Sequence, residues 1–174
     1  LEDLERRAEN GEAEYYEGHL EEELSKLSRN SKVESFMFNP RGDKRLWVYT
    51  KELMVRDPRS NRVHQLGRYE ITIDVTSLQS DGLRVFNLDR QVDGYDPDMQ
   101  APHIFPRGSL CAGNFGGMYE DVIVEEQWAT LVSEVIRFLE SVNTDDVAGK
   151  AVENWPFASD YAKSRYEEEH GNLP

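Results

Sequence analysis

The sequence predicts an α+β fold in which helices pack on one side and at the ends of an antiparallel sheet. Three observations support this prediction. Apolar residues recur at helical spacing in two separate segments, four short strand-like runs follow one another between those segments, and turn residues separate the runs. The 174 residues suit a single domain, and we expect one domain over 1–174 with flexible tails at 1–12 and 171–174.

The first helix is predicted from a stripe of apolar residues that ends at Asn30. The residues of the stripe are Tyr16, Leu20, Leu24 and Leu27. Their spacing of three or four places them on one face of a helix, with Glu and Lys on the other.

Four strands are expected next, over residues 33–38, 46–55, 69–75 and 83–88. Clusters rich in Pro, Gly, Asn and Asp lie between the first three runs, and a Ser-Asp-Gly turn precedes the fourth. The third run alternates strictly, so one sheet face should carry Tyr69, Ile71, Ile73 and Val75. Consecutive strands with short turns favour an antiparallel meander.

From 89 to 125 no periodicity is sustained, and the segment contains several Gly and Pro residues. Such a long irregular segment in a compact domain is usually functional. Helical spacing returns from Trp128 to Val142, which predicts a buried helix of about 17 residues. A short helical piece over 147–154 should follow, and then a last helix with Ser159 as its N-cap that runs to His170.

Composition excludes several classes of function. The net charge of −14 repels phosphate backbones, so we expect no nucleic-acid partner, and the same field would attract a basic protein surface. No run of 18 apolar residues exists, so we expect no membrane partner. One Cys and four scattered His predict no disulfide, no metal site and no cofactor. A cytoplasmic protein is the simplest assignment.

The irregular segment contains the single cysteine, Cys111, eight residues after His103. Pro102, Pro106 and Gly108 favour turns there, which would hold the thiol on a loop accessible to solvent. A thiolate is the strongest nucleophile among ordinary side chains. The competing interpretations are an inert Cys buried in the core and a His that faces solvent.

The order of elements and this segment resemble the ubiquitin-conjugating (E2, UBC-fold) family. That family carries His-Pro-Asn, then Gly, then Cys ten positions after the motif His. Residues of this chain fall on that spacing without a gap: Ala101, Pro102, His103, Gly108, Leu110 and Cys111. Trp128 opens the long helix as the family's Trp does, and Asn143-Thr144-Asp145-Asp146 resembles the family's Asn-Pro-Asp-Asp. The resemblance covers about residues 16–155.

The motif also departs from the family, because Ala101 replaces its His and His103 replaces its Asn. A Pro-His pair here resembles the E2-like proteins of bacterial and phage-defence systems. The resemblance implies that Cys111 accepts a ubiquitin-like protein from an E1-like enzyme as a thioester. It then passes the acyl group to a target amine or another thiol, with or without an E3-like factor.

Each remaining site residue has a role implied by this resemblance. His103 would supply a hydrogen bond to the developing oxyanion, or alternatively act as general base for Cys111. Asp146 would orient the incoming amine, although it could equally be a helix cap. Asn114 and the backbone N–H groups near it are the other candidate donors.

Three other interpretations remain open from the sequence. A non-catalytic UBC-like or RWD-like module could bind a ubiquitin-like protein or scaffold a bacterial defence complex. A phage or bacterial structural protein could share the α+β pattern by coincidence. A papain-like cysteine hydrolase fits less well, because its His follows the Cys in the chain, whereas His103 precedes Cys111.

Overall fold

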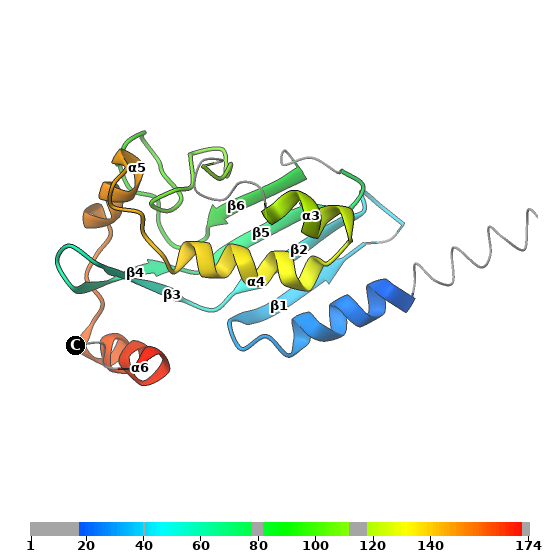
Figure 1. Ribbon diagram of the computed structural model, residues 1–174, viewed down its shortest axis with the longest axis horizontal. Coiled ribbons are helices and arrows are strands. Elements are labelled where there is room, and N and C mark those ends of the chain that lie inside the picture. Colours follow the sequence, from blue (N-terminus) through cyan, green and yellow to red (C-terminus); the bar gives the residue numbers. More distant parts are fainter. Residues whose placement is uncertain (1–17, 40, 78–81, 112–117, 172–174) are drawn as a thin grey trace, which may run out of the picture.

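The computed structural model describes residues 18–39, 41–77, 82–111 and 118–171. The expected tails lie outside this part of the chain, apart from Gly171. A helix over residues 18–28 comes first, followed by strands and then by further helices, so the α+β prediction is confirmed (Figure 1). The strands are β1 (Val33–Phe38), β2 (Arg45–Thr50), β3 (Leu53–Asp57), β4 (Arg62–Gly67), β5 (Tyr69–Asp74) and β6 (Leu83–Asn87). The helices after them are α3 (Met118–Val124), α4 (Trp128–Leu139), α5 (Val147–Lys150), the 3-10 helix η2 (Ala151–Asn154) and α6 (Asp160–His170).

The main sheet has four antiparallel strands in the order β1-β2-β5-β6, as expected for a meander. The middle of the meander differs from the prediction. One strand over 46–55 was expected, but β2 ends at Thr50 and β3 starts at Leu53, and β3 pairs with β4 in a separate two-stranded ribbon. Two features lie at the two ends of this ribbon. The Thr50 hydroxyl accepts the Tyr69 N–H at 3.0 Å, and Gly67, between β4 and β5, adopts a left-handed φ of 114°.

Strand β4 was not predicted at all. Its buried residues do not alternate with exposed ones, because Val63 and His64 are adjacent in the chain and both are buried. The ring of His64 is satisfied inside the protein, where Nδ1 lies 2.7 Å from the carbonyl oxygen of Trp155. A buried polar residue of this kind hides the period of two on which strand prediction depends.

Helix α4 lies across one face of the sheet (Figure 1). Its buried stripe is Trp128, Leu131, Val132, Val135, Ile136 and Leu139. On the third strand of the meander, Tyr69, Ile71, Ile73 and Val75 are buried as expected. The helix begins at Trp128 as predicted but ends at Leu139 and not at Val142, with Glu140 as its C-cap residue.

The helix over 18–28 packs against the start of α4. Leu27 is fully buried, and Leu20 and Leu24 pack against the core as expected. Glu23 is also buried, and its Oε2 accepts the backbone N–H of Ala129 at 2.8 Å. The carboxylate therefore caps α4, whose own N-cap residue makes no side-chain hydrogen bond.

The C-terminal helices follow the prediction closely. Ser159 caps α6 by accepting the Ala162 N–H at 3.2 Å, and α6 ends at His170. Before α6, the chain runs along the outer edge of β4. The Gln65 N–H donates to the Pro156 carbonyl at 2.8 Å, and the Ala158 N–H donates to the Val63 carbonyl at 2.9 Å. This segment, residues 155–158, therefore pairs with part of the outer edge of β4.

Candidate functional site

The loop before Cys111 is folded by backbone hydrogen bonds. The Ile104 N–H donates to the Ala101 carbonyl at 3.0 Å, and the Gly108 N–H donates to the Phe105 carbonyl at 2.8 Å. Gly108 has a left-handed φ of 77°, which a residue with a Cβ rarely adopts. Its carbonyl accepts the N–H of Val85 at 2.9 Å, so the loop is docked on the free edge of β6.

A buried polar network also ties the loop to the sheet. Gln100 is buried, and its side-chain oxygen accepts the Asn87 N–H at 2.8 Å. Its backbone carbonyl accepts hydrogen bonds from the Tyr69 hydroxyl at 3.1 Å and the Asn87 side chain at 3.1 Å. Because buried polar groups are costly unless paired, this network holds the chain in one path as it enters the site.

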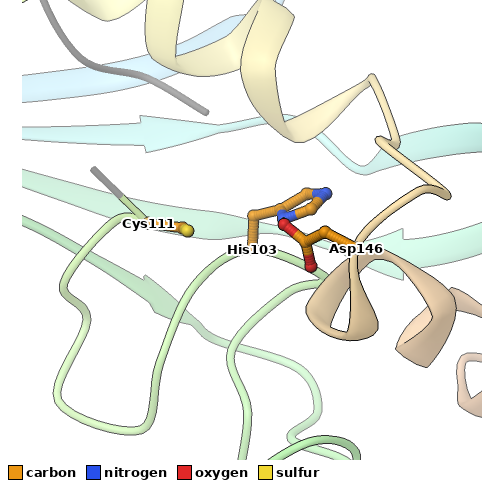
Figure 2. Close-up of side chains that lie close together, drawn as sticks. All are labelled: His103, Cys111 and Asp146. Atoms are coloured by element: carbon orange, nitrogen blue, oxygen red, sulfur yellow. The ribbon is translucent and has the colours of Figure 1, made fainter. Parts of the chain in front are cut away.

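Cys111 lies at the end of this loop and is half-buried, which agrees with the expectation of a residue that is at least partly exposed. Its N–H donates to the His103 carbonyl at 3.0 Å, and this hydrogen bond holds the two ends of the loop from His103 to Cys111 together. Figure 2 shows the side chains of Cys111, His103 and Asp146 gathered in one place, with Asp146 coming from the start of α5. One nitrogen, sulfur or oxygen atom from each lies within 4.8 Å of the others.

The His103 ring is buried, with only 3% of its surface exposed, so the solvent-facing alternative is wrong. Its Nε2 accepts the backbone N–H of Asn143 at 3.2 Å, and its ring lies 5.7 Å from the ring of Phe138 in α4. Burial lowers the pKa of His103, and the nearby Asp146 carboxylate opposes this only in part. The neutral ring with Nε2 as acceptor carries its proton on Nδ1.

Asp146 has two tasks, one for each carboxylate oxygen. Oδ1 caps α5 by accepting the N–H groups of Ala148 at 2.6 Å and Gly149 at 3.2 Å. Oδ2 lies 3.6 Å from Nδ1 of His103, and the side chain is about one-third exposed. The helix-cap interpretation is therefore correct, and it leaves the second oxygen facing the site.

Cys, His and Asp are all residue types that bind zinc. The hydrogen bonding of the ring argues against a metal here. A metal-bound His needs an unprotonated nitrogen toward the metal and normally donates its other N–H to an acceptor. In His103 the lone pair of Nε2 already receives the Asn143 N–H, and the proton is on Nδ1. With this proton position, neither nitrogen of His103 offers a lone pair to a metal ion at this cluster.

Three of the four site residues expected from the sequence thus come together. The fourth, Asn114, lies outside the described residues. Two contributors were missed: the backbone of Asn143, which was singled out only as part of the stretch that resembles the family's Asn-Pro-Asp-Asp, and Gly149, which packs against the site. A backbone N–H carries no signal in the sequence, and a lone Gly after a helix start gives almost none.

Comparison with known proteins assigns no family to this chain. No protein-family model, no curated protein and no solved structure matches it. In the described ranges, no helix combines the length and the apolar character needed to cross a membrane. A functional proposal for this chain must therefore rest on the arrangement of Cys111, His103 and Asp146.

Proposed function

We propose that this chain is an E2-like conjugating protein with a UBC-like fold, which carries a ubiquitin-like protein as a thioester on Cys111. The observation that carries the proposal is the half-buried residue Cys111 beside the buried His103 and the carboxylate of Asp146. The order of a helix, an antiparallel meander, a Cys loop and a long helix supports it, because this is the order in the family that the motif resembles.

Loading is a thioester exchange. The thiol of Cys111 loses its proton to solvent, its sulfur attacks the carbonyl carbon of an acyl thioester on an E1-like enzyme, and a new C–S bond forms. The bond to the E1-like cysteine breaks, and that sulfur leaves as a thiolate. The step needs a thiol that a large partner can reach, which the half-buried position of Cys111 on a loop satisfies.

Transfer to an amine builds negative charge on the carbonyl oxygen. The hydrogen bonding of His103 favours the donor role over the general-base role, because Nε2 is engaged by Asn143 and Nδ1 carries the proton. Oδ2 of Asp146 faces the same space and can orient the attacking amine. The C–N bond forms, the C–S bond breaks, the amine proton passes to solvent, and the Cys111 thiol is regenerated.

The same hydrogen bond disfavours a papain-like hydrolase. In such enzymes one imidazole nitrogen takes the proton of the Cys while the other donates to an orienting side chain. In this protein the second nitrogen of His103 receives a backbone N–H from Asn143. The ring is therefore arranged to donate and not to relay a proton between Cys111 and Asp146.

The test uses preformed thioesters with 2-mercaptoethanesulfonate, one of ubiquitin and one of a diglycine peptide. We expect the native chain to form an adduct that a thiol reductant removes, and we expect Cys111→Ala to form none. Cys111→Ser should give an oxyester and Cys111→Lys an amide, both resistant to the reductant. Intact-mass spectrometry with and without reductant distinguishes these products. A native chain that accepts neither acyl group would instead support the non-catalytic binding module.

A further inference from the structure

Gly149 is the third residue of α5 and is buried beside the site. A Cβ built on it would collide with the carbonyl oxygen of Asn143 and would lie 2.6 Å from the carbonyl carbon of that residue. The same Cβ would lie 3.1 Å from Cε1 of His103. Gly149 therefore contacts both the residue that bonds the imidazole and the imidazole itself.

We infer that Gly149 is a positioning residue, whose missing side chain lets Asn143 approach α5 closely enough to fix the ring of His103. Asn143 uses both of its backbone groups in this arrangement. Its carbonyl packs against Gly149, and its N–H donates to Nε2 of His103 at 3.2 Å. A shift of the carbonyl would move the neighbouring N–H on the same residue and weaken that hydrogen bond.

The backbone conformation of Gly149 does not itself require a glycine at this position. It has no left-handed φ, unlike Gly67 and Gly108, so an alanine could adopt its dihedral angles and would be a better helix former. Its N–H bond to Oδ1 of Asp146 would also survive an alanine. The requirement for glycine is therefore the close approach of Asn143.

The state of the ring can be read directly by ¹⁵N NMR, which distinguishes protonated from unprotonated imidazole nitrogens. In the native chain near neutral pH we expect the proton of His103 on Nδ1. We also expect a scalar coupling across the hydrogen bond between the Asn143 amide nitrogen and Nε2. These measurements need no acyl donor, so they stand or fall independently of the thioester chemistry of Cys111.

The variant is Gly149→Ala, and its matched control is Gly18→Ala, where a Cβ would meet nothing within 4 Å. We expect Gly149→Ala to lose the coupling and to shift the proton from Nδ1 toward a mixture of the two nitrogens. Gly18→Ala should keep both signals.

Three results would overturn the inference. The first is a native chain with its proton on Nε2, and the second is a Gly149→Ala variant that retains the native coupling and proton position. The third is a Gly149→Ala variant that does not fold, because this would make the contact a requirement of the whole fold and not of the ring. A variant that folds but loses only the ring signals is the expected outcome.

Discussion

His103 is a buried imidazole that bonds a backbone N–H at Nε2 and faces a carboxylate at Nδ1. If Nδ1–H stabilises the oxyanion, His103→Ala should slow transfer to an amine by about 10²–10³. Loading should change less. It is an exchange between two similar thiols, and the E1-like partner can supply much of the geometry that the step needs. His103→Asn, which places an amide near the position of Nδ1, should retain more transfer than the alanine variant.

Single-turnover assays with the ubiquitin thioester measure loading and discharge to free lysine separately. Equal discharge rates for the native chain and His103→Ala would assign His103 a structural role. The donor would then be sought among the backbone N–H groups after Cys111.

The titration of His103 also links pH to stability. Because burial lowers its pKa below the ordinary 6.5, the unfolded chain binds this proton at a higher pH than the folded chain does. The contribution of His103 to the free energy of unfolding is complete above about pH 6.5 and falls as the pH drops toward the folded pKa.

Urea unfolding between pH 5 and 7 tests this expectation. The native chain should lose more stability over this interval than His103→Gln, which does not titrate. Parallel curves for the two proteins would show that His103 contributes no pH dependence.

At this scale the sequence predicts which side chains meet but not how they are oriented. The closeness of His103 to Cys111 in the chain and the family resemblance around Asp146 predicted that the three side chains come together, and they do. The tautomer of His103 depends on a backbone group of Asn143, forty residues away, and any residue type supplies such a group. The motif therefore left the donor and base roles open, and only the three-dimensional arrangement favours one.

Among the elements, α4 depends on a carboxylate from another helix. Oε2 of Glu23 accepts the N–H of Ala129, and its Oε1 lies 2.7 Å from Nζ of Lys26. Glu23→Ala should leave a buried N–H without its acceptor and lower the free energy of unfolding by about 1–3 kcal/mol. The matched control is Glu22→Ala, whose side chain is 65% exposed and whose effect should stay within about 0.5 kcal/mol.

Chemical denaturation of both variants measures the difference. Equal midpoints would mean that water replaces the Glu23 carboxylate at no cost and that the contact does not cap α4.

Elements with a regular apolar period were predictable, and the missed ones lack it. The stripe that begins at Trp128 and the cap at Ser159 correctly located α4 and α6. The segment 89–125 was expected to be irregular, yet it contains α3. This helix has seven residues, and of its described side chains only Ile123 is fully buried, so no periodic pattern can form.

In the whole molecule, repulsion between the excess acidic groups lowers the stability of the folded state, whereas ion pairs raise it. With 34 acidic and 20 basic side chains, the net charge is −14. Exposed ion pairs contribute only about 0–1 kcal/mol each. We therefore expect added salt to raise the melting temperature by screening the repulsion.

Calorimetry at low and moderate sodium chloride concentration checks this balance. Each kcal/mol of relieved repulsion corresponds to about 2–4 °C in a chain of this size. A melting temperature that falls with salt would mean that ion pairs dominate, such as those of Lys32 with Glu140 and Glu169.

The segment over residues 155–158 also has a consequence for association between molecules. An uncovered strand edge presents unpaired N–H and C=O groups to which another chain can add a strand. Pro156 and Ala158 occupy the groups of Gln65 and Val63 that would otherwise face outward from β4. The segment over residues 155–158 thus covers this edge of the ribbon, and without it the Gln65 N–H and the Val63 carbonyl would be open to pairing with another chain.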